Sequence, residues 1–223
     1  MAIHYSTSAG DASNTVAAIE RLGRRAIALD ADLSDESATR GLIERVEAAL
    51  SRPTCLVNNA ALFHADDAAT VAYATLESHM RVNLAAPLVL AQAMHRALSA
   101  KQRGVVINLL DQKLFNPNPD YLSYTLSKAA LESATTLLAR ALAPKLRVVG
   151  IAPGITLPSG GQSRKDFHKA HAKTPLGRSS TPADIAAAVC FAVESAAITG
   201  TTLVVDGGQH LVPTERDIMF VTR

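Results

Sequence analysis

The chain has 223 residues, of which 48% are hydrophobic, and this suits one globular domain with a sizeable core and excludes a disordered chain. The net charge is only +2 and no Lys/Arg run concentrates it, so nucleic-acid binding is not expected. No apolar stretch is long enough to span a membrane and no secretory signal opens the chain, so we expect a soluble, cytoplasmic protein. Cys55 and Cys190 lie in apolar runs without metal-ligand spacing; we expect buried, reduced thiols and no metal site.

Short β-branched runs alternate with helical patterns along the chain. We expect strands at Ala2–Tyr5, Ala26–Leu29, Thr54–Val57, Val105–Leu109, Arg147–Ile151 and Thr202–Val205, and helices at about 12–22, 35–50, 70–99, 121–143 and 182–194. Ser34 is expected to cap the second helix, and Thr181 the last one, with Asp184 in its first turn. This alternation predicts a single α/β domain with a doubly wound parallel sheet.

Two segments fall outside this alternation. Pro153–Thr174 is expected to be an irregular binding loop or lid, although a floppy insertion is the alternative. His168 and His171 in it could touch a substrate or simply be solvated. The tail, residues 209–223, contains the apolar run Ile218–Val221, which either folds back on its own domain or covers a neighbouring subunit. We favour the neighbour.

Tyr124 and Lys128 are four residues apart on a predicted helix, so both side chains project from one face. A Lys ammonium near a phenol favours the phenolate, which predicts a lowered Tyr124 pKa. Such a phenol can give a proton to a carbonyl or imine while a hydride arrives at the carbon. For the pair alone, the alternative is an amphipathic helix with a solvated Lys.

Polar residues follow the predicted strands at one edge of the sheet, where open α/β sheets bind ligands. They are Asn58-Asn59-Ala60, Asp111 and Pro153-Gly154. Each could be only a turn former or a cap. Asn83 lies inside an apolar helical pattern, where its amide needs a partner. Successive strand ends carry these residues in this order, and such an arrangement is not expected by chance.

The whole set resembles the pattern of short-chain dehydrogenase/reductases, over nearly all of residues 1–208: Asn58-Asn59-Ala60, Asn83, Asp111, Tyr124, Lys128, Pro153-Gly154 and Val205-Asp206-Gly207-Gly208. The resemblance implies a Rossmann-like fold and an NAD(P)-dependent oxidoreductase. It implies that Tyr124 is the proton donor, that Lys128 holds the nicotinamide ribose, and that Asn83 fixes a water in the proton relay.

The same resemblance implies a set of cofactor contacts. Asp32 and Leu33 would contact the adenine, and Asn59, with the adjoining Ala60, would lie beside its ribose. Thr156 would contact the phosphates or the carboxamide.

Two departures narrow the resemblance to pteridine reductases and dihydromonapterin reductases. Most members of the family have Ser in place of Asp111 and Gly in place of Ala61. The Asp at position 111, together with Phe63 and the opening Ile3-His4-Tyr5, resembles the pteridine reductase group. In that group the aromatic ring stacks on the flat pterin, and the acid joins the Tyr in protonating a ring nitrogen. Reducing a C=N bond does need an acid at nitrogen. The alternative for Phe63 is core packing under the lid.

The turn after the first strand indicates the cofactor. An acid there would bind the adenosine 2′-hydroxyl of NAD, whereas hydroxyl groups accept the 2′-phosphate of NADP. Ser6, Thr7 and Ser8 follow the strand and no acid comes before Asp11, so NADP is favoured. Capping of the next helix is the alternative role of these hydroxyls.

Members of this family begin with a further strand, a glycine-rich turn and a helix, and the turn binds the pyrophosphate. The chain has no such segment, since Ala9-Gly10 lacks the glycine spacing. In the sheet order 3-2-1-4-5-6 the absent strand lies between Ala2–Tyr5 and Thr54–Val57, leaving two strand edges unpaired and buried under helices. We therefore expect Met1 to be an internal methionine of a longer protein, or a late start.

The favoured function is NADP-dependent reduction of a C=N or C=O bond in a small, pterin-like substrate. One alternative is a non-catalytic paralogue that keeps the helices at about 70–99 and 121–143 as an oligomer interface. Another is a reductase for 3-oxoacyl, sugar or steroid carbonyls. The family resemblance also implies a homo-oligomer, a tetramer or a dimer.

Overall fold

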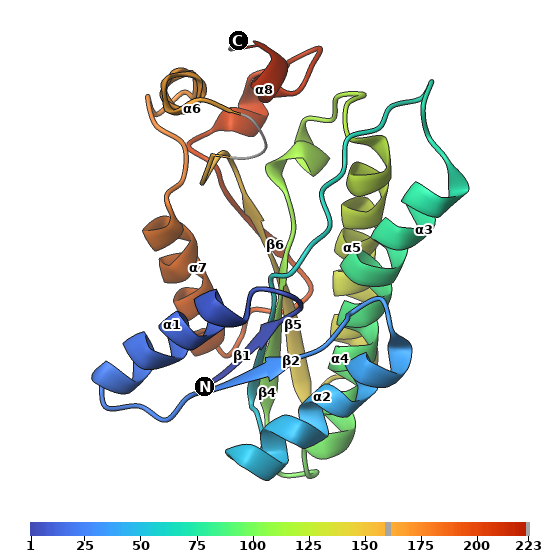
Figure 1. Cartoon of the computed structure of the whole chain (residues 1–223), viewed down its shortest axis with the longest axis vertical. Coiled ribbons are helices and arrows are strands. Elements are labelled where there is room, and N and C mark those ends of the chain that lie inside the picture. Colours follow the sequence, from blue (N-terminus) through green and yellow to red (C-terminus); the bar gives the residue numbers. More distant parts are fainter. Residues whose placement is uncertain (159–161, 222–223) are drawn as a thin grey trace.

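Parallel strands and helices alternate along the computed structural model, which describes residues 1–158 and 162–221 (Figure 1). The elements are β1 Ala2–Tyr5, α1 Ala9–Arg21, β2 Ile27–Asp30, α2 Glu36–Ala49, β3 Cys55–Asn58, α3 Tyr73–Met80, α4 Ala86–Ala97, β4 Gly104–Leu109, α5 Leu122–Ala141, β5 Leu146–Pro153, α6 Arg164–Ala172, α7 Pro182–Glu194, β6 Thr202–Val205 and α8 Ile218–Val221. The predicted α/β fold is confirmed. None of the helices in the described ranges is long and apolar enough to cross a bilayer.

The strands form two parallel sheets, β1–β2 and β3–β4–β5–β6. The division falls between β1 and β3, where the sequence predicts a missing strand. The expectation that these edges are buried is wrong for β3, because Val57 is 42% exposed and Cys55 is exposed. Cys190 on α7 is exposed as well, so the prediction of two buried thiols is also wrong. The β3 edge is open in this structure.

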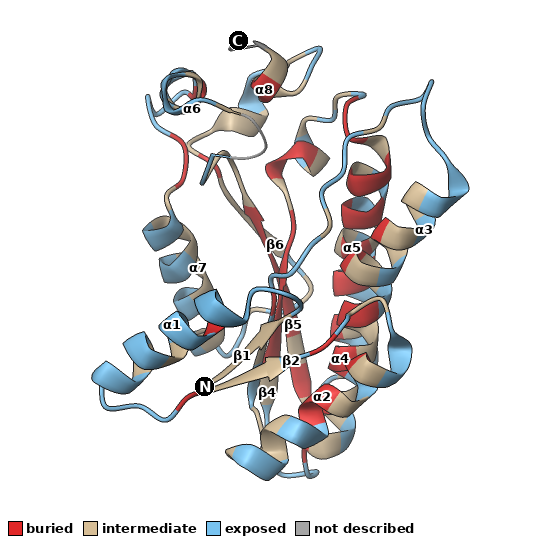
Figure 2. Ribbon diagram, viewed as in Figure 1, coloured by how far each residue is buried: buried red, intermediate tan, exposed pale blue. Residues whose placement is uncertain are grey.

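The core packs against both faces of the larger sheet, and Figure 2 shows buried residues concentrated in the sheet strands and along α5. Side chains alternate along a strand, so Val106 and Val148 face α2 and α4 while Ile107 and Val149 face α7. All four are fully buried. Burial on both faces explains why these strands read as continuous apolar runs.

The helix expected at about 70–99 is interrupted. It divides into α3 and α4 around a π-helical turn at Arg81–Ala85, which contains Asn83. Such turns are rare and occur frequently at functional sites. Here the turn places a buried amide between the two helices.

The caps of α2 and α7 test the predicted helix starts. Asp35, not Ser34, caps α2, since its carboxylate accepts from the backbone N–H groups of Ser37 and Ala38. Thr181 caps α7 as predicted, in a reciprocal capping box with Asp184.

The two segments expected to be irregular have defined structure in their described residues. Residues 164–172, expected to be loop, form α6, which Ser163 caps by accepting from the backbone of Asp166. Residues 159–161 of the expected lid lie outside the described part of the chain. The tail folds back on its own domain, where Met219 is buried against Tyr121 and Tyr124. A contact of the tail with a neighbouring subunit stays a prediction.

Candidate active site

The structure brings Tyr124, Lys128 and Asp111 together at the carboxyl end of β4. Tyr124 Oη donates a hydrogen bond to Asp111 Oδ2 at 2.9 Å. Lys128 Nζ lies 5.8 Å from the centre of the Tyr124 ring and donates to the carbonyl of Leu109 at 2.7 Å. The i, i+4 spacing on α5 therefore places both groups on the sheet-facing side of the helix.

Local backbone structure fixes the orientation of Asp111. This residue caps a short 3₁₀ turn, Gln112–Phe115, and its Oδ1 accepts from the backbone N–H of Lys113 at 2.8 Å. With Oδ1 held by the turn, Oδ2 remains for Tyr124. The sharp chain reversal after the strand thus determines which oxygen faces the phenol.

Burial controls the protonation of this site. It raises the pKa of Tyr124 well above its usual value, and the negative charge of Asp111 and its hydrogen bond raise it further. The predicted lowering of the Tyr124 pKa by Lys128 is therefore wrong in this structure. Burial also raises the pKa of Asp111 and lowers that of Lys128 to about 8. Tyr124 consequently keeps its proton at neutral pH.

Asn83 positions the loop in front of the site. Its Oδ1 accepts from the Leu62 backbone at 2.7 Å, and its Nδ2 donates to the Leu62 carbonyl and to Ser127 Oγ, each at 3.0 Å. The residue is fully buried and its amide is bonded to protein groups. The side chain therefore orders the loop, and the predicted contact with a relay water stays a prediction.

Phe63, which follows Leu62, belongs to an aromatic cluster. Its ring stacks on Tyr121 at 4.2 Å between centroids and meets the edge of Tyr124 at 4.7 Å. It is 38% exposed and still borders the cavity. The two predicted roles, packing and ligand contact, are thus compatible with one position.

A pocket of about 560 Å³ adjoins these side chains. Besides Asp111, Tyr124, Lys128 and Phe63, its lining includes Asn59, Gln112, Pro153, Gly154, Thr156, Gln162, Gln209, Asp217, Ile218 and Met219. Thr156 Oγ1 bonds to Ser180 Oγ at 2.8 Å. Gly154 has no room for a side chain, since a Cβ would lie 2.6 Å from Ser179 Oγ. Lining residues come from the carboxyl ends of β3, β4 and β5, so one cavity lies along this edge of the sheet.

Comparison with known proteins identifies the family. A family model described as enoyl-(acyl carrier protein) reductase matches residues 1–210. The chain belongs to the short-chain dehydrogenase/reductase family. A solved relative is FolM alternative dihydrofolate reductase 1 from Brucella canis, complexed with NADP. It is 39% identical, superposes with a TM-score of 0.91, and the match covers 97% of this chain and 86% of that one.

Other relatives of this short-chain dehydrogenase/reductase carry different names. An uncharacterized oxidoreductase of Methylorubrum extorquens is 32% identical over 217 residues, covering 92% of this chain and 86% of that protein. The 3β-hydroxysteroid dehydrogenase 1 of Eggerthella lenta is 32% identical over 219 residues, covering 94% and 84%. The predicted NAD(P)-dependent oxidoreductase class and Rossmann-like fold are confirmed, because homologous dehydrogenases match along nearly the whole chain.

Most of the predicted adenine-side residues are absent from the lining of the catalytic pocket, whereas Asn59 is part of it. Of the residues that the structure describes, six of the predicted set are not in the pocket lining: Ser6, Thr7, Ser8, Asp32, Leu33 and Ala60. The side chain of Ser8 makes no capping hydrogen bond to α1, so its alternative structural role is not observed. Asp32 Oδ1 instead accepts from the backbone of Ser34 at 2.8 Å. Leu33 packs against the core.

Several residues that the sequence analysis missed hold the site in place. Asp66 accepts from the backbone N–H of Ser123 at 2.9 Å and also from the Ser123 hydroxyl, which anchors the start of α5. His79 Nε2 accepts from the backbone of His64 at 3.2 Å. Neither contact has a sequence signature, because each joins residues distant along the chain.

His171 has a structural position that neither sequence alternative foresaw. Its Nδ1 accepts from the backbone of Ser179 at 3.2 Å, and its Nε2 lies 3.1 Å from the carbonyl of Ser180. The ring therefore ties α6 to the segment before α7 and does not reach the catalytic groups.

Proposed function

We propose that the chain uses NADPH to reduce a C=N bond in a pterin-like heterocycle. The observation that carries this proposal is the 2.9 Å hydrogen bond between Tyr124 and Asp111. Two acidic groups in direct contact suit an acceptor whose nitrogen must gain a proton as its carbon gains hydride. Similarity to FolM alternative dihydrofolate reductase 1, at 39% identity, gives independent support.

The residues around the pocket fit the nicotinamide end of NADPH. Lys128 Nζ is a buried donor at its wall, and Asn59 and Thr156 offer further polar groups. Ser6 and Thr7 carry hydroxyls suited to the 2′-phosphate, with no carboxylate before Asp11 to repel it. NADPH, when bound, supplies the hydride. The solved FolM relative is complexed with NADP, which supports this choice.

Tyr124 acts as the immediate proton donor in this mechanism. Because burial raises its pKa, the phenol carries a proton at neutral pH. In the structure Tyr124 Oη donates to Asp111 Oδ2. Burial raises the pKa of Asp111 and so favours its protonated form. Once Asp111 carries a proton, this hydrogen bond can reverse, so that Asp111 donates to Tyr124 Oη and the phenolic hydrogen is free for the acceptor nitrogen. Lys128 would hold the ribose and balance charge, and its lowered pKa would make that role dependent on pH.

The walls of the pocket suit a small flat ring. Phe63 borders the cavity and is held by stacking on Tyr121, so it presents a fixed apolar surface. A cavity of about 560 Å³ lies in the range of small-molecule sites.

A carbonyl reductase is the second candidate, favoured by the similarity to 3β-hydroxysteroid dehydrogenase 1. A non-catalytic paralogue remains a third hypothesis. A homo-oligomer and a cytoplasmic location stay predictions; Leu126 and Leu137 on α5, 44% and 64% exposed, suit a subunit interface.

A binding and turnover experiment separates these functions. NADPH and NADH are titrated by fluorescence, and NADPH oxidation is then followed with a dihydropterin, a 3-oxoacyl thioester, a keto sugar and a 3-oxosteroid. We expect NADPH to bind more tightly than NADH, and the dihydropterin to give the highest kcat/KM. A higher kcat/KM for a carbonyl acceptor would replace the pterin proposal with the second candidate. Failure to bind either nucleotide would favour the non-catalytic paralogue.

A further inference from the structure

The C-terminal segment, Arg216–Phe220, forms one wall of the catalytic pocket. Asp217, Ile218 and Met219 line the same cavity as Asp111 and Tyr124. Figure 1 places α8 at the end of the molecule where the strands of the larger sheet finish. The segment is thus close enough to the reacting groups to influence them, although it follows Tyr124 by some 90 residues.

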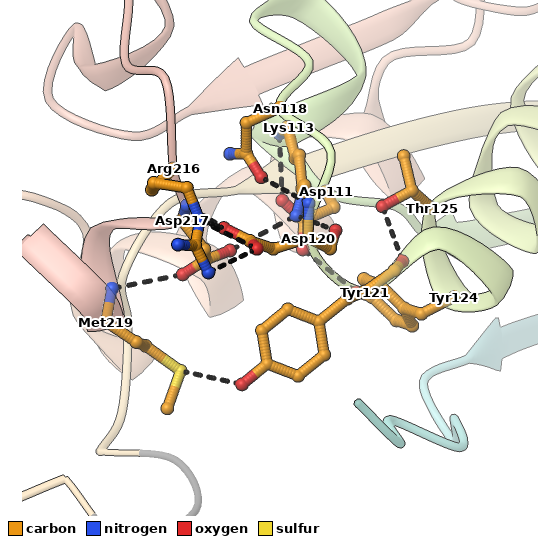
Figure 3. A network of polar contacts seen from close by, with 10 residues as sticks. All are labelled: Asp111, Lys113, Asn118, Asp120, Tyr121, Tyr124, Thr125, Arg216, Asp217 and Met219. Atoms are coloured by element: carbon orange, nitrogen blue, oxygen red, sulfur yellow. Dashed lines mark hydrogen bonds and ion pairs between the residues drawn. The ribbon is translucent and has the colours of Figure 1, made fainter. Parts of the chain in front are cut away.

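Asp120 holds this segment through three hydrogen bonds (Figure 3). Its two carboxylate oxygens accept from Arg216 Nε, each at 2.9 Å, and Oδ2 also accepts from the backbone N–H of Asp217 at 2.7 Å. The Asp120 side chain is only 9% exposed, and Arg216 holds its pKa below the usual value. Arg216 Nη2 also lies 2.8 Å from Asp120 Oδ1, so the ion pair is bidentate and has a well-defined geometry.

Lys113 connects the segment to the catalytic acid. Its Nζ is buried and donates to the carbonyl of Asp120 at 2.5 Å and to Asp217 Oδ2 at 3.3 Å. Its backbone N–H is the group that holds Asp111 Oδ1. The Nζ also lies 5.4 Å from the centre of the Tyr121 ring, on which Phe63 stacks. One residue therefore contacts the acid, the aromatic cluster and the tail.

We propose that Asp120 and Lys113 are positioning residues that dock Arg216–Phe220 as a pocket wall and thereby place the Asp217 carboxylate beside the Asp111–Tyr124 pair. The docking itself follows from contacts within the chain. Its catalytic consequence rests on the proposed function. Release of this segment is expected to weaken acceptor binding and leave the affinity for NADPH unchanged. Met219 packs against Tyr121 and Tyr124, where the proposed function places the acceptor.

The placed carboxylate has an electrostatic effect on the acid. Asp111 faces the phenol of Tyr124, the ammonium of Lys128, the backbone N–H of Lys113 and the carboxylate of Asp217. The negative charge of Asp217 favours the protonated form of Asp111, and Lys128 opposes it. Removing the Asp217 charge should therefore make Asp111 lose its proton at lower pH.

The first test measures docking without any substrate. Backbone hydrogen exchange of residues 215–221 is compared in the full chain, Asp120→Asn and Arg216→Ala. We expect exchange at Asp217, Met219 and Phe220 to accelerate at least about tenfold in both variants, since their N–H groups are held by this network. Arg216 is 56% exposed, so its variant should fold even if Asp120→Asn does not. Glu77→Gln is the matched control, because it removes a carboxylate from an exposed Arg81 pair.

Unchanged exchange in the folded variants would overturn the docking proposal. With any acceptor that the full chain reduces, Asp120→Asn should raise KM much more than it lowers kcat, and the affinity for NADPH should not change. Equal KM values in the full chain and in Asp120→Asn would also overturn the docking proposal. If the full chain reduces no acceptor, the proposed function fails, and hydrogen exchange still decides the docking.

The second test isolates the Asp217 charge. The side-chain carboxyl of Asp111 is titrated by ¹³C NMR in the full chain, in Asp217→Asn and in Glu215→Gln. Glu215 is an exposed neighbour, so its variant removes the same charge away from the pocket. We expect the Asp111 midpoint to move to lower pH in Asp217→Asn alone. An unmoved midpoint, or an equal shift in both variants, would overturn the role of Asp217.

Discussion

The carboxyl-end pocket and the β1–α1–β2 unit differ in how strongly their candidate residues are constrained. Tyr124, Lys128 and Asn83 are buried, and each is bonded to a specific protein group. Ser6 and Thr7 are exposed in the turn after β1. Burial obliges a polar group to find a partner, whereas an exposed hydroxyl can remain solvated.

This difference indicates which predicted roles the structure itself supports. In the pocket, protein contacts alone bring Tyr124 to Asp111 and leave a cavity beside them. In the β1–α1–β2 unit, the cofactor roles depend on the family resemblance. Substitutions in the pocket should therefore have large and specific effects, and those in the turn should have small ones.

Tyr124→Phe should have the largest effect. It removes the proton donor with little change in shape, so kcat should fall about 100- to 10,000-fold, the usual contribution of a general acid. NADPH affinity, followed by fluorescence, should stay nearly the same. Tyr73→Phe is the control, because Tyr73 is 94% exposed. A fully active Tyr124→Phe enzyme would remove the assigned donor.

Asp111→Ser should separate two kinds of acceptor. The second acid is needed at nitrogen, so we expect kcat/KM for a dihydropterin to fall about 100-fold. Turnover of a 3-oxoacyl thioester or a keto sugar should change little, because most of the family functions with Ser there. Phe63→Ala should lower only the dihydropterin rate. Survival of dihydropterin turnover in both variants would contradict the pterin proposal.

Lys128→Met should weaken NADPH binding about 10- to 100-fold, since a hydrogen bond from a charged group contributes about 1.5–3 kcal/mol. Burial lowers the Lys128 pKa to about 8, so the ammonium is present below that pH and lost above it. NADPH affinity of the unmodified chain should therefore fall as the pH rises through about 8. Titrations of the variant should lack this decline. An equal decline in both proteins would point to another group.

Ser6→Asp should have the smallest effect, a loss of NADPH preference over NADH of about fivefold. A carboxylate about 4 Å from the 2′-phosphate repels it by about 1 kcal/mol in water. Ser51→Asp adds the same charge at an exposed position between α2 and β3 and should change neither affinity. Equal NADPH and NADH affinities in the unmodified chain would show that this turn does not select the cofactor.

The sequence predicted the central strands well because their packing is uniform. Val106 and Ile107 are buried on opposite faces of β4, so the apolar run marks the strand directly. The catalytic helix was predicted for a similar reason, since Tyr124 and Lys128 share one face of α5. The helix α6 was missed, because its sequence is mostly polar and Ala170 is its only buried residue. The Ser163 and Asp166 capping pair was the available signal.

Contacts between distant segments could not be predicted. The Asp120–Arg216 pair joins residues 96 positions apart, and no local pattern relates them. The raised pKa of Tyr124 was missed for the same reason, since it depends on burial that only the folded chain creates. Local spacing therefore identified the reactive groups, and tertiary packing determined their protonation.

The most direct test of the account is a double-mutant cycle on Tyr124 and Asp111. Single-turnover NADPH oxidation by a dihydropterin is measured for the unmodified chain, Tyr124→Phe, Asp111→Asn and the double variant. If the two groups act as one acid, the double variant should be no slower than the slower single variant. Losses that multiply in the double variant would show that Tyr124 and Asp111 act independently, and would contradict the mechanism in which Asp111 acts through Tyr124.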